Sequence, residues 1–253
     1  MATNDKNEAF QHMGSLNKQE EETQIHKKRK SFAKDNNQYS CWFGNKDRGP
    51  IWGKASPKEI VDLYDAWAEH GYDEVSYEAP RIAATQVASL YEPSRRSDVA
   101  IIDVGAGTGL VGEKLHEFGF RKIDALDPSS GMLDVAREKQ VYRHLICNYI
   151  QRDTLTDLNG QYDCLTAAGC VIPGHIEADG LHDFIRLVKK GGYVIITMRG
   201  HWPDVPDFFE NFQKVLRTLV EDRKCQLFNR TVIDNYSCII PNSTGYKFVL
   251  KVL

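Results

Sequence analysis

The sequence predicts an α/β fold: a doubly wound, mostly parallel sheet with an antiparallel C-terminal strand. Three observations lead to that prediction. Apolar runs alternate with helical patterns between residues 99 and 198, and such alternation implies βαβ crossovers. A glycine-rich turn follows the first apolar run. The C-terminal "GYKFVLKVL" alternates in the way of an antiparallel strand with one face in the core.

The length and composition suit one domain with an irregular N-terminal part. The chain has 253 residues, and 42% of them are hydrophobic, enough for one substantial core. We expect a disordered tail over residues 1–45, because it is rich in Asn, Gln, Lys and Glu and cannot repay the entropy of ordering. Residues 46–95 are expected to form a docking loop and lead helices, and residues 96–253 the sheet domain.

Charge and motif content exclude several classes of partner. A net charge of −3 argues against nucleic-acid binding. The chain holds neither a signal-peptide pattern nor an apolar run of about 18 residues, so no membrane partner is expected. The six cysteines are scattered without metal-ligand or disulfide spacing. We expect a cytoplasmic monomer without bound metal; "HKKRKS" leaves the nucleus open, although a solvated charge run is the simpler interpretation.

The lead helices have clear start signals. "SPKE" places Ser56 at an N-cap, Pro57 at the first helical position and Glu59 three residues after the cap, which is a capping box. A helix should therefore begin at Pro57. Its apolar stripe falls at helical spacing on Ile60, Tyr64 and Trp67. A second helix is expected over residues 80–90.

The elements of the sheet domain follow in alternation. Apolar runs predict strands over residues 99–104, 122–126, 145–150, 162–167 and 193–198. Helical spacing predicts helices over residues 110–118, 130–139, 181–188 and 208–219. Gly119 should end the first of these helices, and Gly191 and Gly192 should end the third.

The glycine-rich turn "VGAGTGLVG" can be aligned in two registers. Gly107, Gly109 and Gly112 spell the G-x-G-x-x-G of a dinucleotide site, whereas Gly105, Gly107 and Gly109 spell a tighter G-x-G-x-G. A dinucleotide turn that begins at Gly105 would need a third glycine where Leu110 stands. That pattern therefore fits poorly from this start.

The alternative dinucleotide start fits no better. A turn that begins at Gly107 would place Asp103 and a glycine inside a buried strand. The G-x-G-x-G register instead ends the strand at Val104 and puts Asp103 at its carboxyl end, facing the ligand crevice. Gly112 then becomes a close-packing position inside the first turn of the following helix.

An acidic residue about 20 positions after the turn is expected to accept hydrogen bonds from ribose hydroxyls. Asp127 stands at the end of the second predicted strand, whereas its competitor Asp124 lies inside that strand. A carboxylate suits this role because two vicinal hydroxyls can donate to its two oxygens. Met132, in the next helix, has a polarizable side chain suited to an adenine face; the alternative is a core position.

The two motifs resemble those of a known family. "IIDVGAGTGLVG" and "ALDPSSGMLDVAREK" are similar to the first two cofactor motifs of class I S-adenosylmethionine-dependent methyltransferases, which have a Rossmann-like fold. "YDAWAEHGYD" stands where that family has its lead helix, and "LVKKGGYVIITMR" where it has a helix-turn-strand unit. The resemblance spans residues 60–253. "YDCLTAAGCVIPGHI" is similar, more closely, to the methyltransferase-like proteins of the Williams–Beuren syndrome region.

The resemblance implies roles for residues of the glycine turn. The backbone of Gly105, Ala106 and Gly107 would line the methionine part of S-adenosylmethionine. Asp103 would be oriented toward its amino group, directly or through water, and Asp127 would bind the ribose hydroxyls.

Roles after the third and fourth strands are less regular. Gln151 stands where the family often has an acidic residue near adenine, with Asp153 two residues later. Ala168 would contact the cofactor after the fourth strand. Together with Gly169 it replaces the tetrapeptide with which amino-group methyltransferases hold adenine or glutamine, which disfavours those acceptors.

Two further side chains are candidates for the reacting end. Tyr72 would close over the sulfonium, since an aromatic face attracts a cation; a core tyrosine is the alternative. His175 lies just past the fourth strand and has the intrinsic pKa of a general base; a structural histidine is the alternative.

The predicted function is methyl transfer from S-adenosylmethionine to a small molecule or a protein side chain. The lead helices and residues 171–180 would cover the cofactor and shape the acceptor pocket. An NAD-type oxidoreductase on a related fold is one alternative, disfavoured by Asp103 and Leu110. A catalytically silent protein that keeps the cofactor fold is the other.

Overall fold

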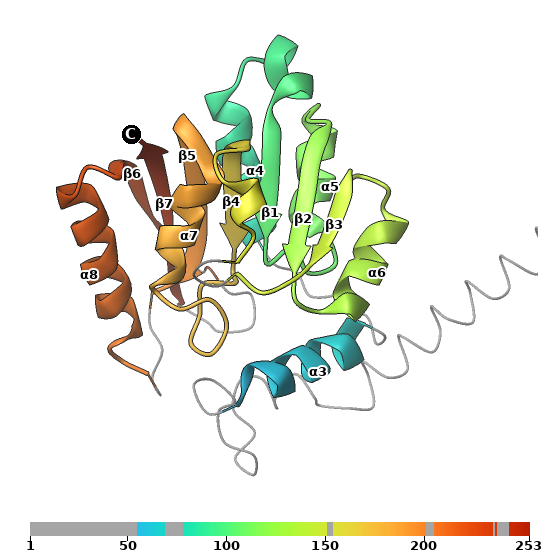
Figure 1. The fold of residues 1–253 in the computed structure, drawn as a ribbon, viewed down its shortest axis with the longest axis horizontal. Helices are drawn as coiled ribbons and strands as arrows, with labels where there is room; N and C mark the ends of the chain where they lie inside the picture. The colour runs from blue at the N-terminus through green and yellow to red at the C-terminus, as the bar shows by residue number, and fades with distance from the viewer. Residues whose placement is uncertain (1–54, 69–77, 151–153, 201–204, 235, 237–242) are drawn as a thin grey trace, which may run out of the picture. The chain divides into compact units, whose positions relative to one another are not determined.

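A computed structural model describes residues 55–68, 78–150, 154–200, 205–234, 236 and 243–253 of the chain. All of them belong to one compact unit, Pro50–Leu253. The predicted tail and most of the predicted docking loop, up to residue 54, lie outside the described residues. Within the unit, helices cover both faces of a seven-stranded sheet (Figure 1).

The sheet is mostly parallel with a reversed C-terminal strand, as the alternating pattern predicts. Its strands are β1 (Ala100–Val104), β2 (Lys122–Asp127), β3 (His144–Cys147), β4 (Tyr162–Ala168), β5 (Val188–Arg199), β6 (Cys225–Asp234) and β7 (Thr244–Val252). The spatial order is β3-β2-β1-β4-β5-β7-β6. Strand β7 runs antiparallel to both neighbours, and the other pairs are parallel.

Helices form a layer on each side of this sheet, and one further helix, α3 (Pro57–Ala68), lies beyond the carboxyl ends of the strands (Figure 1). The others are α4 (Ala79–Leu90), α5 (Leu110–Glu117), α6 (Ser130–Glu138), α7 (Gly180–Leu187) and α8 (Phe208–Glu221). Short 3-10 helices, Pro93–Asp98 and Thr156–Leu158, complete the described elements. Ile101 belongs to the core cluster that includes α4 and α5, whereas its neighbour Ile102 belongs to the cluster that includes α7 and α8. A central strand buried on both faces explains why "AIIDV" is an apolar run rather than an alternating one.

The turn between α7 and β5 differs from the prediction. Helix α7 ends at Leu187 and β5 begins at Val188, so the expectation that Gly191 and Gly192 terminate the helix is wrong. Gly191 has φ +83°, and a Cβ on Gly192 would lie 2.6 Å from the carbonyl oxygen of Asp163. These glycines serve an irregular start of β5 that approaches β4 closely, rather than a helix end.

Strand β6 is an edge strand that no periodic pattern in the sequence predicts. Most of its residues are exposed, including Leu227, Phe228 and Val232. Because neither face of the strand is fully buried, its sequence "CQLFNRTVID" shows no clear alternation.

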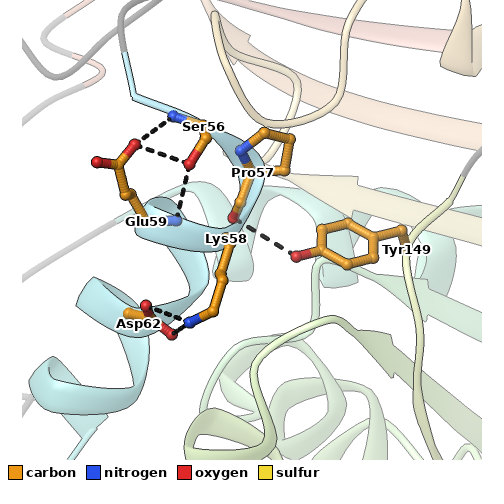
Figure 2. A network of polar contacts seen from close by, with 6 residues as sticks. All are labelled: Ser56, Pro57, Lys58, Glu59, Asp62 and Tyr149. Atoms are coloured by element: carbon orange, nitrogen blue, oxygen red, sulfur yellow. Dashed lines mark hydrogen bonds and ion pairs between the residues drawn. The ribbon is translucent and has the colours of Figure 1, made fainter.

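Helix α3 begins at Pro57 with the predicted capping box (Figure 2). The backbone N–H and the hydroxyl of Ser56 both donate to Oε2 of Glu59, at 2.8 and 2.7 Å. The Glu59 N–H donates to Oγ of Ser56 at 3.3 Å. The hydroxyl of Tyr149, which follows β3, donates to the Pro57 carbonyl oxygen at 3.5 Å. Tyr149 thus links the first turn of the helix to the segment after β3.

Replacing Ser56 with alanine is expected to loosen α3 by about 1 kcal/mol, because an N-cap acceptor and half of the capping box are lost. Hydrogen exchange of the α3 amides would measure this opening free energy. Lys58→Ala is the matched control, since the exposed pair of Lys58 with Asp62 lies on the same turn and such pairs contribute little. Equal effects of the two changes would contradict the capping role.

Candidate functional site

A cavity of about 160 Å³ lies at the carboxyl ends of β1, β2 and β4. Helix α3 contributes its wall through Pro57, Ile60, Val61 and Tyr64. The other lining residues are Val104, Gly105, Gly107, Leu126, Asp127, Pro128, Ser129, Asn148, Tyr149, Ile150, Ala168, Gly169, Cys170, Gly174, His175 and Ile176. This is the edge at which doubly wound sheets bind ligands, and segments from five parts of the chain meet there.

The glycine turn adopts the G-x-G-x-G register. Strand β1 ends at Val104 and α5 begins at Leu110, as that register predicts. Gly105, Gly107 and Gly109 have φ of +65°, +54° and +88°, values that side-chain-bearing residues rarely adopt. A Cβ on Gly105 would lie 2.4 Å from Cβ of Cys170, whereas a Cβ on Gly107 would meet nothing within 4 Å. A side chain at position 105 would therefore clash with Cys170, whereas Gly107 leaves open space beside the cavity.

Gly112 is the close-packing position that the sequence predicts. It lies in the first turn of α5, and a Cβ there would approach the ring of Tyr142 to 2.2 Å. Its N–H donates to the Tyr142 hydroxyl at 3.1 Å. The fourth glycine of the motif therefore admits an aromatic ring against the helix, and the ambiguity of register disappears.

Asp127 lines the cavity, whereas Asp124 does not. The carboxylate of Asp127 accepts hydrogen bonds from the N–H groups of Gly107, at 2.8 Å, and Ser129, at 2.9 Å. Asp124 is instead buried in an ion pair with Arg143, at 2.9 Å. Burial raises the pKa of Asp127 to about 6, and the two backbone donors oppose that rise. Of the two carboxylates, only Asp127 lies at the cavity, and its contact with a ribose stays a prediction.

Asp103 is not in the wall of the cavity. It is 1% exposed, and it accepts hydrogen bonds from the hydroxyls of Tyr142 (2.7 Å) and Thr166 (2.9 Å). The same Tyr142 hydroxyl accepts from Gly112. Asp103 therefore ties β4 and the first turn of α5 to the end of β1. Its contact with the amino group of a cofactor stays a prediction.

We expect the free energy of unfolding to depend on pH through the Asp103 carboxyl. Burial raises its pKa to about 7, despite its hydrogen bonds, whereas an aspartate in an unfolded chain titrates near pH ~3.9. The contribution of the protonated carboxyl to stability is therefore fully present below the unfolded pKa of ~3.9. It is lost as the pH rises toward and through the folded pKa of about 7. Urea unfolding at a series of pH values should show a steeper decline for the wild type than for Asp103→Asn. Parallel profiles would argue against the raised pKa.

The remaining predicted cofactor residues divide into three groups. Ala168 lines the cavity after β4. Ala106 and Met132 are buried, at 7% and 0% exposure, and neither lines the cavity, so Met132 fits the core alternative. Tyr72 and Gln151 lie outside the described residues.

His175 lines the cavity on the loop after β4. Its Nε2 lies 3.0 Å from the Tyr64 hydroxyl, and its Nδ1 lies 3.4 Å from the carbonyl oxygen of Pro173. The rings of Tyr64 and His175 meet edge to face at 5.3 Å. Burial lowers the pKa of His175 to about 4, so the imidazole is neutral around pH 7. A proton on Nδ1 would face the carbonyl and leave Nε2 to accept from Tyr64.

Known proteins are similar to this chain in sequence and in fold. Residues 101–192, which run from β1 to the irregular start of β5, match a family model described as a methyltransferase domain. Methyltransferase-like protein 27 of Homo sapiens is 30% identical over 142 residues, 55% of this chain and 57% of that protein. A methyltransferase of Leishmania major, described as dependent on S-adenosylmethionine, superposes with a TM-score of 0.54 at 13% identity, over 77% of this chain and 82% of that one.

Residues 101–192 are therefore similar to a methyltransferase domain, and the sheet with its helices has the Rossmann-like fold of the Leishmania protein. The ribosomal protein L11 methyltransferase of Staphylococcus haemolyticus is also similar, at 29% identity over 103 residues, 40% of this chain and 32% of that protein. The chain thus spans little more than half of the human relative and about a third of the bacterial one. Within the described ranges, no helix is long and apolar enough to cross a membrane.

The site contains residues that the sequence patterns did not indicate. Asp65 of α3 accepts hydrogen bonds from the Ser129 hydroxyl, at 2.5 Å, and from the Gly131 N–H, at 2.9 Å. Ser129 in turn donates its N–H to Asp127. Through these bonds α3 is attached to the same turn that positions the ribose candidate. A polar residue between the apolar positions of α3 gives no signal in the sequence, because its partners lie more than 60 positions away.

Proposed function

We propose that this protein transfers a methyl group from S-adenosylmethionine to a small molecule or a protein side chain. The observation that carries the proposal is the meeting of two motifs in one cavity: the glycine turn after β1 and the Asp127 carboxylate at the end of β2. They are joined by the hydrogen bond from the Gly107 N–H to Asp127. The match of residues 101–192 to a methyltransferase domain supports the same activity.

The residues present suit this cofactor. Gly107 leaves space next to the cavity that any side chain would fill. Asp127 offers carboxylate oxygens that retain lone pairs for two vicinal hydroxyls after accepting two backbone donors. Gly105, Gly107, Asp127 and Ala168 would hold the bound molecule. When bound, it supplies an electrophilic methyl group on a sulfonium, and the protein's part is positioning and exclusion of water.

Tyr64 and His175 are the proposed polar groups for the acceptor end. Both line the cavity, and Nε2 of His175 is within hydrogen-bond distance of the Tyr64 hydroxyl. With its pKa lowered to about 4, the neutral His175 is a weak base near pH 7. It suits an acceptor atom that is already nucleophilic, for which the pair would orient the acceptor and take up its proton after transfer.

The proposal leaves the domain boundaries and the assembly as predictions. We expect the lead helices to belong to the functional unit, because α3 forms part of the cavity wall. The division at residues 45 and 95, the monomeric state and the cytoplasmic location follow from the sequence patterns. Analytical ultracentrifugation of the full chain would check the monomer.

Calorimetry and labelling together test the function. The full chain should bind S-adenosylhomocysteine and not NAD; binding of NAD alone would overturn the proposal. Incubation of labelled S-adenosylmethionine with fractionated cell extract should then label a specific small molecule or protein. Cofactor binding without transfer to any fraction would favour the catalytically silent alternative.

A further inference from the structure

Three polar residues lie in line with the cavity on the sheet face that packs against α4. In register, Ala168 of β4 pairs with Thr197 of β5, and Thr197 pairs with Lys247 of β7. Paired residues on adjacent strands project to the same face of a sheet. Arg199, two residues beyond Thr197, shares that face. Because Ala168 lines the cavity, the row extends from the cavity wall across β5 to β7.

Thr197 has an unusual environment for a hydroxyl. Its side chain is fully buried at 0% exposure. Among the residues that the structure describes, its Oγ1 is the buried side-chain atom without a hydrogen-bond partner. A buried polar group left unpaired is costly, and such a group in a native protein calls for an explanation, for example an ion or a water that satisfies it.

Lys247 and Arg199 bring positive charge to the same place. Both are partly buried, and burial lowers the pKa of each. Within the described part of the chain, Lys247 forms no ion pair; its cross-strand neighbours are Thr197 on β5 and Thr231 on β6. A partly desolvated cation between two hydroxyl-bearing side chains is suited to receive an anion.

The distance to the cavity fits a small ligand. Neighbouring strands lie about 4.8 Å apart, so the backbone of Lys247 is about 10 Å from that of Ala168. One small molecule could therefore present a reacting atom in the cavity and an anionic group to Thr197 and Lys247.

We propose that Thr197, Lys247 and Arg199 form an acceptor subsite that binds a carboxylate or phosphate group. The methyl acceptor would then be an anionic small molecule. This assignment of substrate class rests on the proposed methyl transfer, but the binding of an anion by the three residues does not.

Nuclear magnetic resonance on the full chain, saturated with S-adenosylhomocysteine, tests anion binding directly. Titration with inorganic phosphate or with acetate, at constant ionic strength, should shift the γ-methyl resonance of Thr197 in a saturable way. Lys247→Met should weaken this binding about tenfold, as expected for the loss of one charge-assisted contact. The absence of a saturable shift in the wild type, or an unchanged affinity in Lys247→Met, would overturn the subsite.

Lys251→Met is the matched control. Lys251 lies on the same strand and face, but its ammonium lies 5.9 Å from the ring centre of Tyr193, away from the cavity. The Lys251→Met variant should bind the anion with the affinity of the wild type. Thr197→Val provides a second variant: it should weaken anion binding while the thermal midpoint stays equal or rises, because it removes the unpaired hydroxyl. A merely structural Thr197 would lose stability and leave the anion affinity unchanged.

The substrate class has its own readout. Cell extract is separated by anion exchange into retained and unretained small molecules before incubation with labelled S-adenosylmethionine. Label should enter the retained fraction, and Lys247→Met should reduce it about tenfold relative to Lys251→Met. Label confined to the unretained fraction would overturn the anionic acceptor. If neither the small-molecule fractions nor the protein of the extract is labelled while the Thr197 resonance still shifts with phosphate, the methyl transfer fails and the anion site stands. Label in the protein alone would overturn the anionic small-molecule acceptor.

Discussion

Asp127→Ala is expected to weaken binding of S-adenosylhomocysteine about 100-fold, because hydrogen bonds from two ribose hydroxyls to a carboxylate are lost together. Isothermal titration calorimetry at a pH well above 6 would measure the effect, since the pKa of Asp127 is raised to about 6 and the ionised form is the acceptor. The affinity of the wild type should accordingly fall as the pH drops through that value.

A ligand control separates ribose recognition from damage to the turn, because Asp127 also accepts the N–H groups of Gly107 and Ser129. The 2′-deoxy analogue of S-adenosylhomocysteine should bind the wild type about tenfold more weakly than the parent compound. In Asp127→Asn the two compounds should bind alike. A preference for the parent compound that persists in this variant would show that another group binds the ribose.

Gly107→Ala is expected to abolish measurable cofactor binding at a modest cost in stability. Gly107 has φ +54° and open space around the position of a Cβ. An alanine there costs about 1 kcal/mol because of the left-handed backbone conformation, but its Cβ contacts no protein atom. The added methyl group would instead occupy space beside the cavity that the cofactor needs. Chemical denaturation and calorimetry on the same sample would measure both effects.

Gly160→Ala is the matched control for this second prediction. Gly160 has φ +61° and also no atom within 4 Å of an added Cβ, but it lies before β4, outside the cavity wall. Both variants should lose a similar free energy of unfolding, and only Gly107→Ala should lose the ligand. If both variants bind S-adenosylhomocysteine like the wild type, the glycine turn does not contact the cofactor.

Local patterns predicted the elements around the cavity well. The capping box of Ser56 and Glu59 placed the start of α3, because its donors and acceptors lie within one turn. The register of the glycine turn followed from Asp103 and Leu110 on either side of it. The prediction that Gly191 and Gly192 end the helix was wrong, because glycines after an apolar helical stripe are equally compatible with a helix end and with an irregular strand.

Side-chain roles were predicted less completely. Asp127 could be chosen over Asp124 because a strand end faces the ligand edge of the sheet. Asp103 was expected to face the same crevice, but it is held by Tyr142 and Thr166, which come from distant segments. The contact of Tyr64 with His175 also had no signal, since the two residues are 111 positions apart.

The sequence by itself therefore determined the α/β class, the order of the elements, the register of the glycine turn and the position of Asp127 at the ligand edge of the sheet. Each of these depends on spacing within one or two neighbouring elements. Only the tertiary structure decided which polar groups meet: Asp65 with Ser129, Tyr64 with His175, and Thr197 beside Lys247. The physical reason is that such contacts depend on how helices and strands pack, and packing joins residues whose separation along the chain follows no period.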